Sequence, residues 1–296
     1  MHLPYSVQVE LSLGCTRQCD FCGLQAVWKQ GKTPVKFMSL ETAEIIAKKL
    51  GEWLPKARIE FAMFGEPTLN SHVVDILKVF TEYFPKGHKM LNTNGDILIQ
   101  HGKNIQYERI KSLFDAGLNV LAINVYEDEY YKTILQQLKE NINYAKVGEY
   151  FEGQNYYNYG NPKTRKEITL VKSIASYNGD ISTRVIYNHA GNVPDNSILK
   201  YGGKVLAEPI KAMCTKPFRE MVFRYNGDIS FCCFDVANEA RMGNVLTDNL
   251  NDMWFGNEWN ERRKHLLDKQ RTDIPCNKCN YPGGFRKGLE YNWFKK

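Results

Sequence analysis

Eight cysteines are the residues of this 296-residue chain whose type and spacing could do chemistry, and they form two groups. Cys15, Cys19 and Cys22 lie together near the N-terminus, and the other five lie beyond residue 213. The chain does not open with a basic and then an apolar segment, so we expect no secretory signal and a cytoplasmic location. In a reducing cytoplasm, cysteines serve metal binding or catalysis more often than disulfides. Their distribution therefore predicts two separate metal sites.

The first group has the spacing Cys-x3-Cys-x2-Cys and directly follows residues 7–11, whose alternation of apolar and polar residues predicts a strand. Three thiolates so close together can hold three corners of a cubane iron–sulfur cluster. With no fourth protein ligand nearby, one iron keeps an open position, where catalytic metal sites receive their reactant. Zinc is the alternative, but structural zinc sites usually pair two short two-cysteine segments, and this group has no nearby partner.

The segment from Cys15 to Cys22, with aromatic Phe21 before the last cysteine, resembles the signature of the radical S-adenosylmethionine (SAM) superfamily. In that family the open iron of a [4Fe–4S] cluster chelates SAM, and reductive cleavage of SAM gives methionine and a 5′-deoxyadenosyl radical. The radical abstracts hydrogen from a substrate C–H bond, while the protein orients the substrate and excludes water from the site. The resemblance implies that Phe21 lies among the cofactor-binding residues.

Three further segments resemble motifs of this family, in order on successive predicted strands. Gly65-Glu66 resembles the motif that binds the amino group of SAM, with Phe64 in place of the first glycine of the usual Gly-Gly-Glu. A carboxylate that accepts from an ammonium group forms a charge-assisted pair. Asn94 lies in a Thr-Asn-Gly segment that ends the third strand, and Asn124 stands on the fourth, where many members contact the ribose. The resemblance, over roughly residues 5–190, implies SAM contacts at these positions.

The second group, Cys214, Cys232, Cys276 and Cys279, resembles the auxiliary-cluster domains called SPASM and twitch. No cysteine follows Cys279, so the resemblance implies the shorter twitch type with one auxiliary cluster. Four thiolates would saturate a [4Fe–4S] cluster and make it an electron-transfer centre. A structural zinc site with four cysteines is the alternative. We expect Cys233 to pack as a small hydrophobe, although its exchange with Cys232 as a ligand stays open.

Alternating strands and helices are expected to position these sites. Predicted strands cover 7–11, 59–64, 90–93, 120–125 and 182–187, and predicted helices cover 73–84, 107–116 and 129–145. A further helix is expected to begin with Ser39 as its N-cap and to end at Pro55, whereas 168–173 could be helix or strand. This alternation predicts an α/β fold with a parallel sheet and outer helices. The family resemblance implies a partial (β/α)6 barrel.

The pattern changes near residue 200, where we place a domain boundary. Two short β-like segments, 221–225 and 228–231, flank Asn226-Gly227 and predict a hairpin, and 250–267 predicts a helix that contains tryptophan. We therefore assign 1–200 to the radical SAM barrel and 201–296 to the auxiliary-cluster domain. The Tyr-rich segment 148–165 is either a substrate lid or a surface insertion.

Composition and charge limit the partners. Hydrophobic residues make up 43% and charged residues 24% of the chain, as in ordinary globular proteins, and no apolar segment approaches the about 18 residues that span a membrane. Residues 261–296 carry ten Lys/Arg and four Asp/Glu, which accounts for the net charge of +6. Such a tail could meet an acidic substrate, a nucleic acid or an acidic electron donor, or could simply be a solvated helix face.

The leading hypothesis is an oxidoreductase that cleaves SAM, abstracts a substrate hydrogen and passes an electron to the auxiliary [4Fe–4S] cluster. This arrangement resembles the aminocyclitol alcohol dehydrogenases of antibiotic pathways. The substrate would be a small molecule or a peptide, and the electron donor a protein such as flavodoxin or ferredoxin. Peptide epimerisation or cross-linking is the alternative within the family. A zinc-stabilised nucleic-acid-binding module would not explain Cys-x3-Cys-x2-Cys at a strand end.

Overall fold

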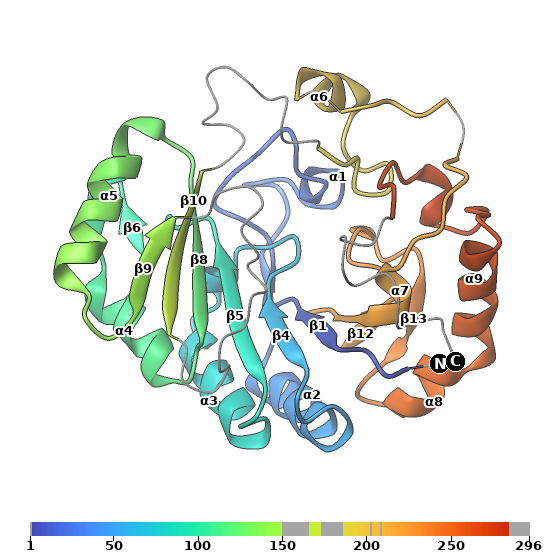
Figure 1. Cartoon of the computed structure of the whole chain (residues 1–296), viewed down its shortest axis with the longest axis horizontal. Coiled ribbons are helices and arrows are strands. Elements are labelled where there is room, and N and C mark those ends of the chain that lie inside the picture. Colours follow the sequence, from blue (N-terminus) through green and yellow to red (C-terminus); the bar gives the residue numbers. More distant parts are fainter. Residues whose placement is uncertain (1, 150–165, 173–185, 202, 208, 284–296) are drawn as a thin grey trace.

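A nine-stranded mixed sheet forms the centre of the computed structural model, which describes residues 2–149, 166–172, 186–201, 203–207 and 209–283 (Figure 1). Its strand order is β13-β12-β11-β1-β4-β5-β8-β10-β9. The seven strands from β11 to β9 pair in parallel, whereas β12 and β13 are antiparallel. The parallel strands are β1 (Ser6–Val9), β4 (Arg58–Phe61), β5 (His88–Thr93), β8 (Val120–Val125), β9 (Lys146–Glu149), β10 (Glu167–Lys172) and β11 (Glu220–Phe223). The antiparallel strands are β12 (Asp228–Ser230) and β13 (Arg241–Asn244).

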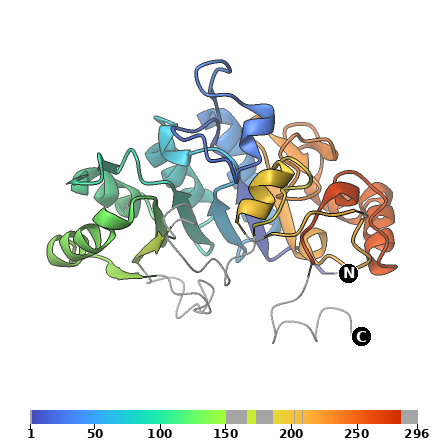
Figure 2. The same cartoon turned by 90° about the horizontal axis from the view of Figure 1, so that it is seen from above.

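Four helices pack on one face of the parallel strands (Figures 1 and 2). They are α2 (Leu40–Trp53), α3 (Val73–Tyr83), α4 (Tyr107–Asp115) and α5 (Asp128–Asn141). The predicted start of α2 is confirmed, because the Ser39 hydroxyl accepts a hydrogen bond from the Thr42 N–H and satisfies one of the free donors of the first turn. The helix ends at Trp53, two residues before Pro55.

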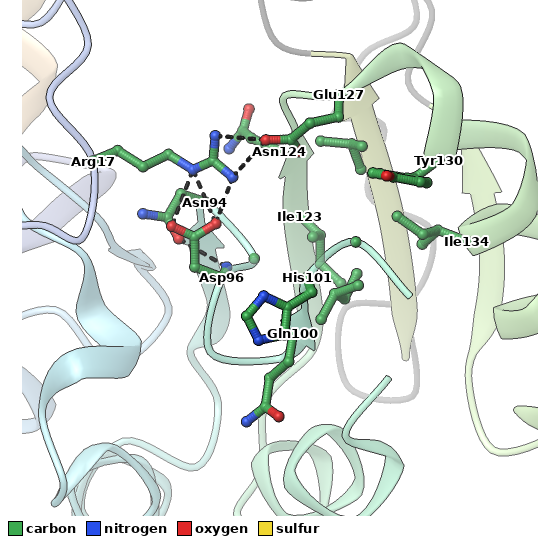
Figure 3. A pocket seen from close by; sticks show the side chains of 14 residues that line it. Arg17, Asn94, Asp96, Gln100, His101, Ile123, Asn124, Glu127, Tyr130 and Ile134 are labelled. Carbon is green, nitrogen blue, oxygen red and sulfur yellow. Dashed lines mark hydrogen bonds and ion pairs between the residues drawn. The ribbon is translucent and has the colours of Figure 1, made fainter. Parts of the chain in front are cut away.

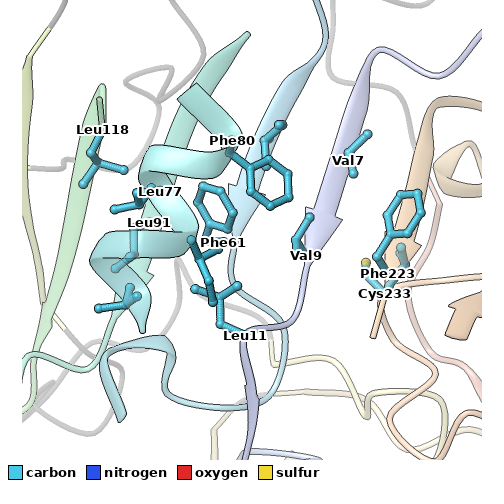
Figure 4. Close-up of a cluster of buried hydrophobic side chains, with 14 of the residues drawn as sticks. Val7, Val9, Leu11, Phe61, Leu77, Phe80, Leu91, Leu118, Phe223 and Cys233 are labelled. Atoms are coloured by element: carbon cyan, nitrogen blue, oxygen red, sulfur yellow. The ribbon is translucent and has the colours of Figure 1, made fainter. Parts of the chain in front are cut away.

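Buried side chains of the strands and of α3 form the core (Figure 4). Val9 and Phe61 lie in register on neighbouring strands, and the ring of Phe61 meets that of Phe80 edge to face with centroids 5.0 Å apart. Both phenylalanines are fully buried, and a fully buried side chain of this size contributes about 1.5–3 kcal/mol of transfer free energy. The core fixes the strands side by side, so the loops at their carboxyl ends meet at one edge of the sheet.

The C-terminal region continues this sheet. β11 pairs in parallel with β1, on the side opposite β4, with Val7 facing Met221 and Val9 facing Phe223. The Trp254 indole N–H also donates to the His2 carbonyl oxygen at 2.9 Å. The sequence pattern changes near residue 200, but strands from before and after this position belong to the same continuous sheet.

The predicted α/β fold with parallel strands and outer helices is confirmed, with differences in detail. β10 lies between β8 and β9, so the last two parallel strands do not follow in chain order as they would around a barrel. Residues 168–172, left open from the sequence, belong to strand β10. The predicted strand at 182–187 lies outside the described residues up to 185, and 186–187 are not in a strand. Most of the Tyr-rich segment, 150–165, also lies outside the described residues.

The single helix predicted over 250–267 is wrong, because the structure has two helices, α8 (Leu250–Phe255) and α9 (Asn257–Leu267). Gly256 separates them in an extended conformation, with φ −67° and ψ 161°. A Cβ atom there would lie 2.6 Å from the Asp252 carbonyl oxygen, so the close approach requires glycine. Among the described residues no helix is long and apolar enough to cross a membrane.

The smaller elements lie in the connections between these strands and helices. Two short antiparallel pairs are β2 (Ser12–Leu13) with β3 (Lys36–Phe37), and β6 (Ile99–Gln100) with β7 (Asn104–Ile105). The short helices are α1 (Leu24–Val27), α6 (Asp195–Lys200), α7 (Lys216–Arg219), η1 (Pro67–Leu69) and η3 (Cys276–Lys278).

Candidate functional site

The first cysteine group lies in the loop between β2 and α1, beyond the carboxyl end of β1. Cys15, Cys19 and Cys22 are half-buried and free. Burial raises the pKa of all three thiols, that of Cys22 to about 12, and the charges of Cys15 and Cys19 add to the effect on Cys22. The structure therefore brings the three predicted ligands together, and binding of a metal cluster there would release their protons.

Gly65-Glu66 packs directly against the segment that leads into Cys15. The Glu66 N–H donates to the Gly14 carbonyl oxygen at 2.9 Å, and the Ser12 hydroxyl donates to the Glu66 carbonyl oxygen at 2.6 Å. A Cβ atom on Gly65 would lie 1.7 Å from the Ser12 carbonyl oxygen, so no other residue fits there. The predicted motif and the first cysteine group are thus neighbours in space.

The Glu66 carboxylate is 2% exposed and joins the motif to the end of β5. Its Oε1 accepts from the Thr68 N–H and hydroxyl and from the Thr93 hydroxyl, at 2.9, 2.6 and 2.6 Å. Its Oε2 accepts from the Asn94 N–H at 2.7 Å. Burial raises the pKa of Glu66, and these hydrogen bonds oppose the rise by favouring the charged form. Oε2 keeps acceptor capacity, because a carboxylate offers about four lone-pair sites.

Asn94 also reaches the first cysteine group, since its Nδ2 lies 3.3 Å from Cys15 Sγ. Asn124 on β8 donates through Nδ2 to Asn92 Oδ1 and to the Thr93 carbonyl oxygen, at 2.8 and 3.0 Å. The structure therefore brings Glu66, Asn94 and Asn124 to adjacent strand ends beside Cys15.

Phe21 contacts a different part of the fold. Its ring meets Tyr201 edge to face at 5.5 Å, and the neighbouring Asp20 accepts from the Tyr201 hydroxyl and from Lys200 at 2.8 Å each. Among the described contacts, Phe21 packs against the 186–201 segment rather than against the strand ends that carry Glu66 and Asn124.

Arg17 forms a clamp over these strand ends that sequence reasoning missed (Figure 3). Its guanidinium binds Asp96 through Nε and Nη2, at 2.9 and 2.6 Å, and reaches Glu127 Oε1 at 3.1 Å. It also stacks 4.0 Å from the ring centroid of Tyr126, whose hydroxyl is hydrogen-bonded to the Cys19 thiol. The clamp fixes the cysteine loop to the ends of β5 and β8. The sequence offered one signal for this clamp, because Asp96 directly follows the Thr-Asn-Gly segment that was already predicted to end a strand at the site.

A cavity of about 700 Å³ opens beside the clamp (Figure 3). Arg17, Asp96 and Glu127 line one part of it, and the predicted cofactor contacts Asn94 and Asn124 also reach it. The cavity therefore adjoins the group of strand-end residues that the sequence singled out.

The second cysteine group is also assembled by the fold. Cys214 precedes α7, Cys232 follows β12, and Cys276 and Cys279 lie at η3; all four are buried and free. Burial raises the pKa of Cys214, Cys276 and Cys279, that of Cys276 to about 12, and their charges act on one another. A hydrogen bond with Cys233, together with burial, raises the pKa of Cys232.

A repeated backbone turn distinguishes five of the seven predicted ligands. In each, the N–H of the second residue after the cysteine donates to its Sγ, as seen in the pairs Arg17–Cys15, Leu24–Cys22, Lys216–Cys214, Phe234–Cys232 and Tyr281–Cys279. Such bonds stabilise a thiolate, and hydrogen bonds to sulfur tune the potential of an iron–sulfur cluster. Among the described contacts Cys233 has no bond of this kind, so the turn favours Cys232 as the ligand.

Two cations flank the second group. The Lys216 side chain is 13% exposed, and its Nζ lies 3.4 Å from Glu220 Oε2 and 5.1 Å from the ring centroid of Phe234. Arg271 is buried and donates through Nε and Nη1 to the carbonyl oxygens of Ala212 and Tyr281, but its buried Nη2 has no partner among the described residues. A buried donor of this kind fits an anionic group, and a cluster held by four thiolates is anionic.

His189 connects the two groups, and sequence reasoning missed it. Its Nδ1 accepts from the Gly23 N–H, next to Cys22, at 2.9 Å. Its ring stacks on Phe234 at 5.4 Å and meets Phe64 at 5.8 Å. Burial lowers the pKa of His189 to about 4, so the ring is neutral at pH 7 and carries its proton on Nε2. Nothing in the local sequence pattern distinguishes this histidine from a packing residue.

Both cysteine groups offer thiol ligands, the donor set of iron–sulfur clusters. Four cysteine thiolates are also the donor set of a structural zinc site, the alternative at the second group.

Two family models match this chain. The model described as the radical SAM superfamily matches residues 9–149, and the model described as an iron–sulfur cluster-binding domain, SPASM, matches residues 214–280. A curated relative, the S-adenosyl-L-methionine-dependent 2-deoxy-scyllo-inosamine dehydrogenase of Niallia circulans, is 23% identical over 283 residues, covering 93% of this chain and 92% of the relative.

Solved structures agree at the level of the fold. The crystal structure of BtrN in complex with AdoMet and 2-DOIA has a TM-score of 0.68 at 21% identity, covering 95% of this chain and 94% of that one. Native anSMEcpe with bound AdoMet has a TM-score of 0.52 at 15% identity, covering 90% and 84%. With both cysteine groups assembled as described and both family models matched, the chain belongs to the radical SAM superfamily, as an enzyme that uses SAM and iron–sulfur clusters and carries a SPASM iron–sulfur cluster-binding domain.

Proposed function

We propose that this enzyme oxidises a secondary alcohol of a small polar molecule to a ketone, in the cytoplasm. The observation that supports the proposal most is the second cysteine group, in which four buried thiols and two flanking cations form a closed site for an electron acceptor. The Niallia circulans relative, a SAM-dependent dehydrogenase, covers both regions of the chain. All eight cysteines are free, which agrees with a reducing compartment.

Cys15, Cys19 and Cys22 would hold the SAM-binding [4Fe–4S] cluster, which with SAM supplies a 5′-deoxyadenosyl radical that takes a hydrogen atom from a substrate carbon. The second group would hold a [4Fe–4S] cluster that accepts one electron. Loss of one hydrogen atom, one proton and one electron converts the alcohol to the ketone, so the oxidation balances.

The side chains of this chain supply binding and orientation. Glu66 Oε2, which accepts only one hydrogen bond from the described residues, would accept the SAM ammonium group. Asn124 donates both of its described hydrogen bonds through Nδ2, so its Oδ1 would accept from a ribose hydroxyl. His189 would present its Nε2–H as a hydrogen-bond donor to a substrate oxygen, because its Nδ1 is occupied by the Gly23 N–H.

Iron content tests the assignment of the clusters. Anaerobic reconstitution is expected to give about eight irons and eight sulfides per chain, as two four-iron clusters. The variant with Cys15, Cys19 and Cys22 replaced by alanine is expected to keep about four irons, because the second group lies on other elements. Replacing Cys233 alone should leave about eight, since the backbone turn marks Cys232. Zinc without sulfide in the wild-type protein would contradict the assignment.

Deuterium transfer tests the reaction. The reconstituted enzyme is incubated with SAM, a strong reductant and aminocyclitols or sugars deuterated at each carbinol carbon in turn. We expect mass spectrometry to find deuterium in 5′-deoxyadenosine from one labelled position and a ketone at that carbon. If deuterium reaches 5′-deoxyadenosine only when a peptide labelled at Cα or Cβ is supplied instead, the enzyme modifies peptides and the alcohol-oxidation proposal is wrong.

A further inference from the structure

Residues 28–37, from the end of α1 through β3, form a segment that covers the first cysteine group and projects from the fold; it is part of the blue projection in Figure 2. We call it the cover segment. Trp28 is 2% exposed and belongs to an apolar cluster against which Cys15 and Cys22 pack. Gln30 Nε2 donates to the Thr16 carbonyl oxygen at 2.8 Å. The inner side of the cover segment therefore lies directly on the loop that would hold the SAM-binding cluster.

Strand pairing fixes the other end of the cover segment. Lys36 is paired with Leu13, and Phe37 with Ser12, in the short β2–β3 ladder that ends two residues before Cys15. Both ends of the cover segment are thus joined to the cysteine loop, one through the β2–β3 ladder and the other through the apolar packing of Trp28. A protein bound to the outer side of the segment would be held close to the cluster.

The outer side of the cover segment is basic and partly apolar. Lys29, Lys32 and Lys36 are exposed, and none forms an ion pair with a described residue. Residues 21–40 contain these three lysines and no Asp or Glu. Phe37 is 47% exposed next to Lys36, which is unusual for a large aromatic side chain. Three exposed lysines within eight residues make this surface positively charged, so it would attract an acidic protein.

We propose that the cover segment is the docking site for a small acidic one-electron carrier protein of the flavodoxin type. Each cleavage of SAM needs one electron from outside the chain, delivered to the cluster held by Cys15, Cys19 and Cys22. At the contact one electron passes from the reduced carrier to the cluster, and no bond forms or breaks. The inference rests on radical SAM chemistry and on the need for an external electron, and it is independent of the substrate.

Charge complementarity supports this occupant. Steering between opposite charges raises association rates by about 10- to 1,000-fold, and the effect falls as salt screens the charges. The basic tail at 261–296 is the other concentration of positive charge along the chain. Three of its six described Lys/Arg lie on α9, which is at the β13 end of the sheet, away from α1 (Figure 1). Within the part of the chain that the structure describes, the cover segment is therefore a basic surface directly next to the loop that would hold the SAM-binding cluster.

The test compares two electron sources in the reconstituted enzyme without substrate. The variant Lys29→Glu/Lys32→Glu/Lys36→Glu reverses the charge of the cover segment. The control Lys48→Glu/Lys56→Glu/Lys86→Glu makes the same change at exposed positions on α2 and before β4 and β5, away from the cysteine loop. The rate of 5′-deoxyadenosine formation is measured with reduced flavodoxin over a range of concentrations, and with dithionite, which needs no docking.

We expect the cover-segment variant to lose at least about tenfold in kcat/KM for flavodoxin, with the dependence on salt also lost, while its dithionite rate and iron content stay at the wild-type level. The control should keep both rates. If charge reversal also lowers the dithionite rate, Lys29→Gln/Lys32→Gln/Lys36→Gln is used, for which the same selective loss is expected.

Several results would overturn the proposal. One is an unchanged flavodoxin KM in both cover-segment variants, and another is an equal loss in the control. A third is loss of binding to anionic vesicles or to single-stranded DNA with a wild-type flavodoxin rate, which would assign the basic surface to those partners. Failure of the alcohol-oxidation proposal would leave this assay unaffected, because no substrate is present.

Discussion

Replacing Cys276 and Cys279 together by serine is expected to abolish the ketone product while 5′-deoxyadenosine formation continues. The two cysteines lie at η3, a different element from the loop between β2 and α1 that carries Cys15, Cys19 and Cys22. Without their thiolates the auxiliary cluster would lose two of its four proposed ligands, and the substrate radical would have no electron acceptor. The residues proposed to bind SAM lie at the ends of β4, β5 and β8, on other elements than η3. Product and 5′-deoxyadenosine are measured in the same reaction by mass spectrometry.

Cys233→Ser is the matched control, because it changes a buried thiol next to Cys232 and leaves all four predicted ligands in place; the serine hydroxyl can still form a hydrogen bond with Cys232. It should keep both products. Wild-type ketone formation by a soluble Cys276→Ser/Cys279→Ser variant would rule out electron transfer through this site. Loss of both products, with a lower melting temperature, would instead show a purely structural role, since the binding energy of a cluster is also folding energy.

Glu66→Gln is expected to weaken SAM binding by about 10- to 150-fold, which corresponds to about 1.5–3 kcal/mol for a hydrogen bond to a charged group. The substitution keeps the size of the side chain but removes the charge that would pair with the SAM ammonium. It also turns an amide NH₂ toward donors at Thr68, Thr93 or Asn94, which now face the carboxylate. Equilibrium dialysis of SAM against the reconstituted protein gives the affinity.

The variant Thr93→Val distinguishes the proposed contact between Glu66 and SAM from the hydrogen bond by which Thr93 positions the Glu66 carboxylate. It removes one donor to Glu66 Oε1 and leaves Oε2 in place, so SAM affinity should fall by less than about tenfold, the loss expected for a neutral hydrogen bond of about 0.5–1.5 kcal/mol. Equal affinities of the Glu66→Gln and wild-type proteins would show that the Gly65-Glu66 motif has been misassigned.

The sequence predicted the parts of the site that depend on local spacing. Cys15, Cys19 and Cys22 lie within eight residues, so their convergence needs only one loop. The Gly65-Glu66 and Thr93-Asn94 segments could be placed because each ends a strand, and parallel strands bring such ends together. The hydrogen bonds that join Glu66 to Thr93 and Asn94 follow from that placement, although the sequence did not reveal them.

Contacts between distant segments could not be predicted in this way. The Arg17 clamp depends on residues about 80 and 110 positions away, and His189 lies between the cysteine groups only because the 186–201 segment packs on Phe21. The order of β9 and β10 is also set by long-range pairing, since both segments have the same local character of a short parallel strand. The sequence alone does not reveal the break at Gly256, because a single glycine inside a helix costs only about 1 kcal/mol.

The parallel pairing of β11 with β1 has a consequence for how such enzymes can be divided or recombined. β1 is bordered by β4 on one side and by β11 on the other, so a chain cut before β11 would leave a row of unpaired N–H and C=O groups along Ser6–Val9. An open apolar edge of this kind is a template for aggregation. The auxiliary-cluster region is therefore not a detachable module: a chimera that exchanges it must supply a strand in the register that pairs Val7 with Met221 and Val9 with Phe223.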